Sequence, residues 1–459
     1  AKHDWQIMCD VAAKMGFAEA FNFTHPSQIF CEYAGLTGYQ NNGQRQLDLS
    51  PLQNITQAQY DAMSPLQWPF TTSDELQGMQ GLNSKRPFAD KQFSTPNGKA
   101  KLIPVVFKAP QQQTSKLFPF VVNSGRARDQ WHTMTRTGKA AKLLAHTSNA
   151  SVHVSPHDAK TLGARNKDYV ALHSAACVDA PVIYPVKIDE DMRKGEVFIP
   201  IHWSAQYGSH CKLGSLYASA VDPISGQPEL KHAAVAIEPV RFTTYGKVFV
   251  ASIVQNAQPS EFNFLDEVAL QHACDYWTKT PIEGAVLTAN TNLSGDASTV
   301  FNIASNKGRR AFTQDVLPLL PQNTVLLQFH HHTYSVCIAL VDDKLCFAAF
   351  LGDEPEQEAA VDANVGWSVP NAWVASLLNT SISLETQRKL LRTQVDEAFL
   401  NGDVVCSCFE VREKTISDAI EGGCSSVTEL GKKLKCGTNC GSCKPALSQR
   451  INQHALIGA

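Results

Sequence analysis

The clearest helical pattern of apolar residues lies at the start of the chain. Apolar side chains recur there every three to four residues, which predicts an amphipathic helix. The residues that follow this period are Trp5, Ile7, Met8, Val11, Ala12, Met15 and Phe17. From there to about residue 105 the chain is rich in loop residues, and a turn before residue 102 predicts a strand over 102–107. A polar linker is expected at 111–115.

From Phe118 onward the pattern changes to short apolar runs separated by turn residues. These runs predict strands over 120–123, 151–154, 169–173, 180–186 and 196–200. Between them, Ser155 is the expected N-cap of a short helix that has Pro156 in its first position and ends at Gly163. Many short strands with few helices are typical of a β-barrel domain.

Residues 246–400 carry a weaker pattern. Three strands are predicted over 325–329, 334–341 and 345–351, and Ser383 is the expected N-cap of a later helix. Three consecutive histidines occupy 330–332, at the end of the first of these strands. Adjacent residues of a strand point to opposite faces, so we expect a polar strand end there rather than a metal site.

Composition and charge narrow the classes of protein. The chain has 459 residues, enough for roughly three or four domains of ordinary size. A formal net charge of −3 gives no reason to expect nucleic acid or an anionic membrane as a partner. The sequence contains no apolar run of the roughly 18 residues that a membrane helix requires, and it shows no secretory signal.

Seven of the 13 cysteines lie outside the C-terminal region and stand singly, as small buried apolar residues often do. They are Cys9, Cys31, Cys177, Cys211, Cys274, Cys337 and Cys346. This usage suits a reducing compartment, and we therefore expect a cytoplasmic protein.

The C-terminal cysteines are spaced for a metal or cluster site. A Cys-x-Cys pair, Cys406 and Cys408, is followed by a Gly-rich run that contains Cys436, Cys440 and Cys443. Four thiolates are the usual protein ligands of a [2Fe–2S] cluster, and glycines let backbone N–H groups approach the sulfurs. We expect Cys406, Cys408, Cys440 and Cys443 to be the ligands and Cys436 to be a neighbour.

Structural zinc and free thiols remain alternatives, although zinc sites usually have longer spacing than Cys-x-Cys. Two capping patterns, at 415–418 and 426–429, predict helices between the ligand pairs, and Pro445 starts a third helix. Helix N-termini near the site would favour a negatively charged cluster.

This region resembles the bacterioferritin-associated-ferredoxin-like [2Fe–2S] domain, which is found appended to assimilatory nitrate and nitrite reductases. The resemblance covers residues 404–451 and includes the Cys-x-Cys, the spacing to Cys440 and the Gly-Ser before Cys443.

A second chemistry-bearing segment, residues 123–138, directly follows a predicted strand. Gly125 would let backbone N–H groups approach a phosphate, and Arg126 and Arg128 can form paired hydrogen bonds with phosphate oxygens. Trp131 and His132 offer a stacking face for a fused heterocycle. The residues alone are equally compatible with a solvated surface loop. The dinucleotide pattern G-x-G-x-x-G does not occur here, so NAD is not indicated.

This segment resembles the molybdopterin-dinucleotide-binding loop of the dimethyl sulfoxide reductase family, in its nitrate reductase and formate dehydrogenase branch. Further similarity lies at 155–159, 195–203 and 221–231. The resemblance implies a C-terminal barrel, of double-psi type, that covers a molybdenum-bis(molybdopterin guanine dinucleotide) cofactor. It implies cofactor contacts from Ser124, Gly125, Arg126, Arg128, Gln130, Trp131, His132 and Thr133. His202, or Ile201 beside it, would also contact the cofactor, and so would Lys231.

The fold class that follows is a multi-domain α+β protein with a molybdopterin-binding barrel and a small helical [2Fe–2S] domain. We expect four parts. Residues 1–110 would be the remainder of a molybdopterin oxidoreductase domain, and 116–245 the dinucleotide-binding barrel. Residues 246–400 would be a linking α/β domain, and 401–459 the [2Fe–2S] domain.

The resemblance implies part of a molybdenum-dependent nitrate reductase of nitrate assimilation, an oxidoreductase in which the [2Fe–2S] domain accepts electrons. The expected donor is ferredoxin, flavodoxin or an NADH-dependent reductase subunit, and nitrate is the expected substrate. The alternatives are a formate dehydrogenase of the same family and a non-catalytic iron–sulfur electron-transfer or binding protein.

Two features of the family are not found in the sequence, namely a Cys-x2-Cys-x3-Cys motif for a [4Fe–4S] cluster and a cysteine ligand of molybdenum. We therefore expect the catalytic residues, the [4Fe–4S] cluster and most of the nitrate pocket in an upstream half. The chain alone is predicted to be inactive with nitrate.

Overall fold

The computed structural model divides the chain into two compact units, residues 1–108 and 109–459. It describes residues 2–45, 47–65, 70, 88–144, 147–251, 273–282, 298–320, 323–356, 367–396, 399–402, 404–406 and 408–457. No helix among these residues is long and apolar enough to cross a membrane.

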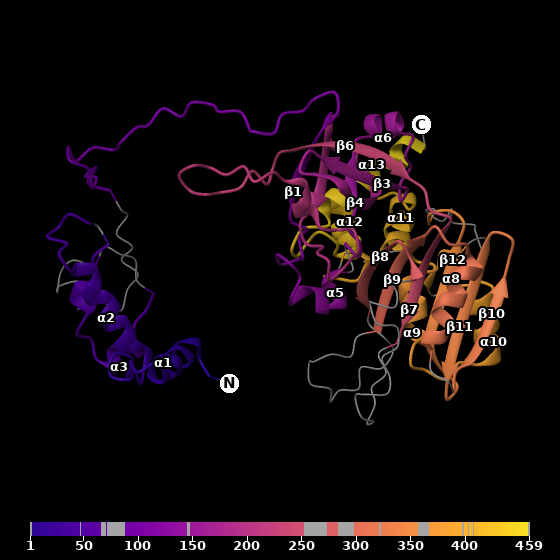
Figure 1. Cartoon of the computed structure of the whole chain (residues 1–459), viewed down its shortest axis with the longest axis horizontal. Coiled ribbons are helices and arrows are strands. Elements are labelled where there is room, and N and C mark those ends of the chain that lie inside the picture. Colours follow the sequence, from indigo (N-terminus) through magenta and orange to yellow (C-terminus); the bar gives the residue numbers. More distant parts are fainter. Residues whose placement is uncertain are drawn as a thin grey trace. The chain divides into compact units, whose positions relative to one another are not determined.

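The first unit is a small helical body (Figure 1). It comprises α1 (Asp4–Lys14), α2 (Pro26–Gly38), a 3-10 turn η1 (Ser50–Leu52) and α3 (Gln57–Asp61). The predicted amphipathic helix is confirmed as α1, although most of its apolar side chains are exposed. The predicted strand over 102–107 is wrong: this stretch is extended but unpaired, and Leu102 and Val105 are 91% and 95% exposed.

The second unit begins with a closed six-stranded barrel in the order β1-β5-β2-β4-β3-β6. The strands are β1 (Phe120–Gly125), β2 (Val152–Val154), β3 (Tyr169–Ser174), β4 (Cys177–Ile188), β5 (Glu196–Pro200) and β6 (Ala233–Val240). β1 pairs with β5, and β2 with β4, in parallel, whereas the other pairings are antiparallel. The helix α6 (Pro156–Leu162) begins at Ser155, whose side chain caps the Asp158 amide, and ends at Gly163 in the left-handed conformation, as predicted.

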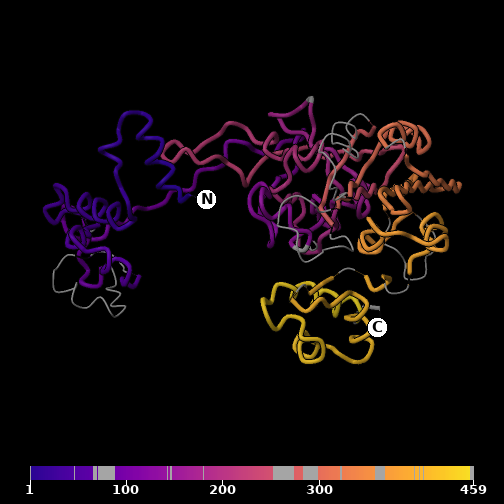
Figure 2. The backbone as a smooth tube through the Cα atoms, turned by 90° about the horizontal axis from the view of Figure 1, so that it is seen from below, coloured from indigo at the N-terminus to yellow at the C-terminus, as the bar shows by residue number. Residues whose placement is uncertain are grey.

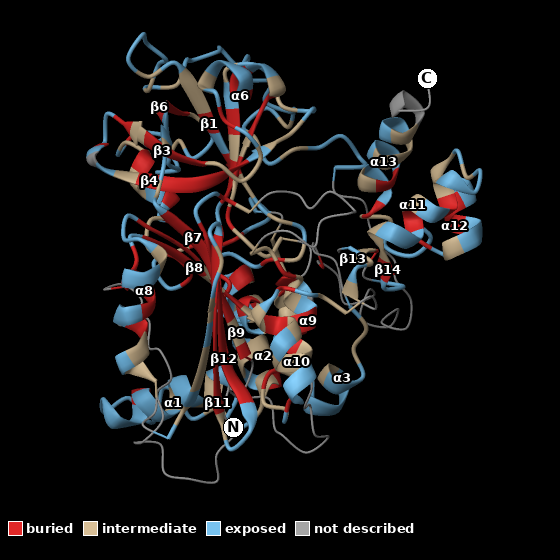
Figure 3. Cartoon of the chain, turned by 90° about the vertical axis from the view of Figure 1, so that its right-hand side faces the viewer, coloured by how far each residue is buried: buried red, intermediate tan, exposed pale blue. Residues whose placement is uncertain are grey.

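A six-stranded sheet follows, in the order β10-β11-β12-β7-β9-β8. Its strands are β7 (Thr244–Val250), β8 (Tyr276–Ile282), β9 (Ser298–Ser305), β10 (Val325–His330), β11 (Tyr334–Val341) and β12 (Lys344–Gly352). One apolar layer packs the sheet against α8 (Arg309–Val316), and another packs it against α9 (Asn371–Leu377) and α10 (Leu384–Leu391). Figure 3 shows the sheet edge-on, with these helices on its two faces.

An ion-pair group connects the barrel to this sheet. Glu356, which follows β12, lies 2.5 Å from the Lys247 ammonium of β7 and 3.3 Å from that of Lys167, which precedes β3. The two lysines hold the pKa of Glu356 at about 2, although burial of the carboxyl opposes this shift.

The C-terminal residues form a small domain of helices with one two-stranded sheet, traced in yellow in Figure 2. Its elements are β13 (Val404–Cys406), β14 (Val411–Arg412), α11 (Glu413–Glu421), α12 (Val427–Leu434) and α13 (Lys444–Ile457). Ser426 caps α12 as predicted. The predicted start of α11 at Thr415 is wrong: the helix begins two residues earlier, directly from β14.

Candidate cysteine site and cofactor loop

The four proposed ligands come from two connections of the C-terminal domain. Cys406 and Cys408 lie at the end of β13 and just beyond it, and Cys440 and Cys443 lie in the loop between α12 and α13. This loop turns sharply at Gly437 and Gly441, whose φ angles are 76° and 74°. Side chains other than glycine are strained there, so the glycines set the course of the loop.

The four thiols meet as two pairs. Cys408 Sγ lies 3.3 Å from Cys440 Sγ at the exposed side, and Cys443 is in hydrogen-bonding contact with Cys406 at the buried side. No three His, Cys, Asp or Glu side chains of the described chain converge to hold a single metal ion. A cluster of two irons needs two thiolates per iron, and this arrangement of separate pairs fits it better than a single tetrahedral zinc.

The two pairs differ in their electrostatics. Hydrogen bonds from Ser442, followed by that from Cys408, lower the pKa of the Cys440 thiol to about 7. Burial, followed by contact with Cys406, raises the pKa of Cys443 to about 11. The exposed pair is therefore the one that more readily supplies a thiolate.

Cys436 occupies a different position from these four. It is fully buried in the apolar core of the domain, and its Sγ lies 3.6 Å from the Leu430 carbonyl oxygen. Burial raises the pKa of its thiol as it raises that of Cys443, so the pKa does not separate the two. The difference is that Cys436 Sγ contacts a backbone carbonyl rather than another thiol. This placement supports the prediction that Cys436 is a neighbour rather than a ligand.

The predicted cofactor loop begins at the end of β1, and the buried side chain of His202 forms hydrogen bonds with its backbone. The imidazole Nδ1–H donates to the His132 carbonyl at 2.7 Å, and Nε2 accepts from the Ala127 N–H at 2.8 Å. Burial lowers the pKa of His202, so the ring is neutral, as these two bonds require. His202 is fully buried, and both of its ring nitrogens are committed to the loop backbone.

The loop has a strained backbone that a further hydrogen bond holds in place. His132 and Met134 adopt positive φ angles of 27° and 58°, a conformation that side chains other than glycine rarely take. Met134 is buried, and the Tyr207 hydroxyl donates to its carbonyl at 2.8 Å. The surrounding contacts therefore hold the loop in a strained conformation.

The ten predicted cofactor contacts divide by exposure. Ser124 and Gln130 are buried like His202, whereas the others of the loop that carry side chains are exposed. The exposed residues are Arg126, Arg128, Trp131, His132 and Thr133. The loop thus presents its cationic and aromatic side chains outward from a rigid base.

The two arginines differ in availability. Arg128 is paired with its neighbour Asp129 at 2.5 and 2.8 Å, and this carboxylate raises the pKa of the guanidinium. Arg126 instead lies 5.9 Å from the Trp131 ring centroid and 3.5 Å from His132 Nε2. A phosphate group would find Arg126 without a carboxylate competitor among the described residues, whereas at Arg128 it would compete with Asp129.

Gly125 is required for a reason that the sequence did not indicate. A Cβ at this position would lie 2.5 Å from the Phe198 ring of β5. The glycine therefore lets β1 and β5 pack closely, and its role in approaching a phosphate stays a prediction.

Ser124 and Lys231 form a second anchor of the loop. The Ser124 hydroxyl donates to the Leu230 carbonyl, and the Lys231 ammonium donates to the Ser124 carbonyl. Two residues that the sequence reasoning missed lie close by. Tyr217 is half-buried beside Ser124, and burial raises the pKa of its hydroxyl. His232 directly follows Lys231 in the chain, and this adjacency was the only signal in the sequence for His232. Tyr217 carried no such signal.

Buried polar atoms without a partner support a ligand at this loop. Gln130 Oε1 and His232 Nε2 have no hydrogen-bond partner within the described part of the chain. Buried polar groups are normally satisfied, and each one that is not calls for an explanation such as a bound group. A bound group with hydrogen-bond donors would satisfy Gln130 Oε1, and the exposed cationic and aromatic side chains of the loop fit an anionic, heterocyclic cofactor.

Comparison with known families agrees with this geometry. Residues 120–234 match the molybdopterin dinucleotide binding domain, and residues 404–453 match the BFD-like [2Fe-2S] binding domain. The chain contains both of these domains. The first match covers the barrel with its loop, and the second covers all four proposed cysteine ligands.

Similar proteins extend the comparison beyond the two domains. A nitrate reductase of Klebsiella oxytoca is 30% identical over 97% of this chain and 46% of its own length. The assimilatory nitrate reductase catalytic subunit of Bacillus subtilis is 28% identical over 52% of this chain and 31% of its own length. An F420-dependent formate dehydrogenase subunit alpha of Methanocaldococcus jannaschii is 27% identical over 52% of this chain and 31% of its own length. The chain thus spans less than half of each of these relatives.

Proposed function

We propose that this chain is part of a molybdenum-dependent nitrate reductase of nitrate assimilation, to which it supplies a cofactor-covering barrel and an electron-entry domain. The whole enzyme would reduce nitrate to nitrite with two electrons and two protons, releasing water. The observation that carries the proposal is the match of one chain to both domains, with the two thiol pairs in the second. A [2Fe–2S] cluster accepts and donates single electrons, which suits a domain that receives them from a soluble donor.

Within the barrel, we assign different tasks to the buried and exposed residues of the loop. Arg126 and Lys231 would bind phosphate oxygens of the dinucleotide, and Trp131 would present an aromatic face to its heterocycle. His202 would act as a positioning residue, because its two ring nitrogens hold the loop backbone. Ser124 and Gln130 would shape the base of the loop and donate or accept hydrogen bonds there.

Within the C-terminal domain, Cys406, Cys408, Cys440 and Cys443 would hold the cluster. The paired geometry assigns Cys408 and Cys440 to one iron, and Cys406 and Cys443 to the other. The first pair is exposed, so we place the approach of the electron donor on that side. Ferredoxin, flavodoxin and an NADH-dependent reductase subunit are the donor classes to be compared.

A formate dehydrogenase is the second candidate, since formate dehydrogenases are also relatives. The relative that matches 97% of this chain, and therefore both of its domains, is a nitrate reductase. The formate dehydrogenase of Methanocaldococcus jannaschii matches 52% of it. The nitrate reductase of Bacillus subtilis also matches 52% of this chain, so partial coverage does not separate the two classes. The match of a nitrate reductase across both domains is what favours that function.

Steady-state assays separate the two activities. The enzyme that contains this chain, purified with its cofactors, should oxidise reduced viologen with nitrate and should not reduce oxidised viologen with formate. The isolated 459-residue chain should be inactive in both assays. Formate activity without nitrate activity would replace the proposed function with the second candidate.

A further inference from the structure

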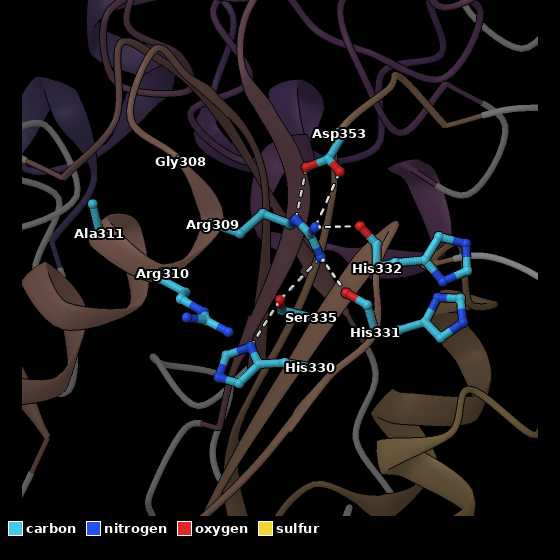
Figure 4. A pocket seen from close by; sticks show the side chains of 9 residues that line it. All are labelled: Gly308, Arg309, Arg310, Ala311, His330, His331, His332, Ser335 and Asp353. Atoms are coloured by element: carbon cyan, nitrogen blue, oxygen red, sulfur yellow. Dashed lines mark hydrogen bonds and ion pairs between the residues drawn. The ribbon is translucent and has the colours of Figure 1, made fainter.

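An open surface cavity of about 480 Å³ lies at the second sheet, away from both sites described above. It is formed by the start of α8, the end of β10, the following turn and the residue after β12 (Figure 4). Its lining is cationic and rich in imidazole groups. The lining side chains are Arg309, Arg310, Ala311, His330, His331, His332, Ser335 and Asp353, with Gly308 at the rim.

Arg309 is the fixed centre of this cavity. Its guanidinium forms an ion pair with the Asp353 carboxylate at 2.6 and 3.0 Å. It also donates to the carbonyls of His331 and His332 at 3.1 and 2.8 Å, and to Ser335 Oγ at 3.1 Å. Asp353 is the only carboxylate among the described residues that line the cavity, and Arg309 occupies it. Arg309 is therefore a structural group that is already neutralised.

The contact with Arg309 sets the protonation of His330. Ser335 Oγ accepts a hydrogen bond from Arg309, so its own O–H is free to donate to His330 Nδ1, which lies 3.0 Å away. A ring that accepts at Nδ1 carries its proton on Nε2. Burial, and then the charges of Arg310 and Arg309, lower the pKa of His330, which keeps the ring neutral at neutral pH. His330 thus offers an N–H donor to the cavity that it lines.

Arg310 is the cation of this lining that has no counter-charge within the described part of the chain. Its guanidinium extends toward His330 (Figure 4), and no acidic side chain of the described chain pairs with it. Arg309 and Arg310 also occupy the first turn of α8, which has no acidic residue and no capping side chain. Cations there oppose the helix dipole, and a bound anion would offset this. Arg310 is exposed, so its guanidinium is accessible to such an anion.

We propose that this cavity binds the phosphate group of a small molecule between Arg310 and His330. A phosphate dianion matches one uncompensated guanidinium and further N–H donors. The cavity volume lies within the range of about 300–1,000 Å³ that small-molecule sites occupy, so an ester that carries an organic group also fits.

Isothermal titration of the full chain in chloride buffer tests this proposal, with inorganic phosphate, AMP and nitrate as separate probes. We expect saturable binding of phosphate or AMP at a site that Arg310→Gln weakens at least tenfold, whereas any binding of these probes at the cofactor loop should be unchanged by that substitution. Tighter binding of AMP than of phosphate identifies an ester as the ligand class, and equal binding identifies free phosphate. Arg310→Lys should retain part of the affinity, because the charge remains and the fork geometry is lost.

Arg388→Gln is the matched control, because it removes an exposed arginine from α10 of the same sheet domain and should leave binding unchanged. Far-ultraviolet circular dichroism of each variant checks that the fold is retained. The proposal is overturned if no phosphate probe saturates, if nitrate binds equally well, or if Arg310→Gln binds like the wild type. The viologen assays with nitrate and formate do not depend on Arg310, so the two failures are distinguishable.

Discussion

At the scale of single residues, the imidazole of His202 has a different role in the structure from the one that the sequence resemblance implies. The sequence resemblance makes His202 a cofactor contact, and the structure commits both of its nitrogens to the backbone of the loop that would make the contact. The sequence resemblance was sufficient to identify His202 as a residue of this site. The long-range pairings, with partners about seventy residues away in the chain, could not be found from spacing.

Replacing His202 with alanine should destabilise the barrel by about 2–4 kcal/mol, because the loop N–H and carbonyl lose their partners and the fully buried ring leaves a cavity. Urea unfolding followed by circular dichroism measures this change. His157→Ala is the control, because its side chain is 57% exposed, and should change stability by less than about 0.5 kcal/mol. Equal effects of the two substitutions would contradict the positioning role of His202.

At the C-terminal site, the sequence likewise predicted the positions of the cysteine ligands but not their contacts. Spacing alone selected four of the five clustered cysteines, and the contact of Cys436 Sγ with the Leu430 carbonyl, rather than with another thiol, supports that choice. The division of the four into an exposed and a buried pair was not predictable, since it depends on how β13 meets the loop before α13.

At the scale of elements, the sequence predicted helix caps reliably, but it did not predict which segments pair as strands. Ser155, Ser383 and Ser426 cap the helices that they were predicted to cap, because a cap is decided within four residues. The strand predicted at 102–107 is absent because a strand also needs a neighbour, and the described residues offer none to it. The start of α11 was misplaced because β14 leads directly into the helix.

The ion-pair group of Glu356 joins two elements and predicts a pH dependence. The pKa of Glu356 is lowered to about 2 from an ordinary value of 4.5, so its contribution to stability is complete above about pH 4.5. The contribution is lost as the pH falls toward 2, and the shift corresponds to about 3 kcal/mol as an upper bound.

Glu356→Gln should therefore reduce the free energy of unfolding by about 2–3 kcal/mol at pH 7, and the difference from the wild type should shrink below pH 4. Urea unfolding between pH 7 and pH 3 measures this dependence. Glu354→Gln is the control, because that carboxylate is 71% exposed and lies 3.9 Å from Arg165. A constant difference across this pH range would show that Glu356 acts through packing alone.

At the scale of the whole molecule, the class of fold followed from the sequence and the topology did not. Runs of short strands predicted a barrel, which the structure closes with two parallel pairings. Three strands of the later sheet were expected, but its order, with β7 beside β12, joins segments about a hundred residues apart. Such pairings are decided by packing between distant segments, which leave no periodic signal in the chain.

The cavity at Arg310 also belongs to this scale. The three histidines were interpreted as a polar strand end, and the last residue of β10 is His330. What the sequence could not indicate is that α8 and the residue after β12 bring two arginines and one carboxylate to the same place.

The most direct test of the central claim is low-temperature electron paramagnetic resonance of the reconstituted, dithionite-reduced chain, together with its iron content. We predict an S = 1/2 signal with about two irons per chain in the wild type and in Cys436→Ala. Cys408→Ser and Cys440→Ser should each lose most of the signal. One zinc per chain without an S = 1/2 signal, or loss of the signal in Cys436→Ala but not in Cys440→Ser, would contradict the account.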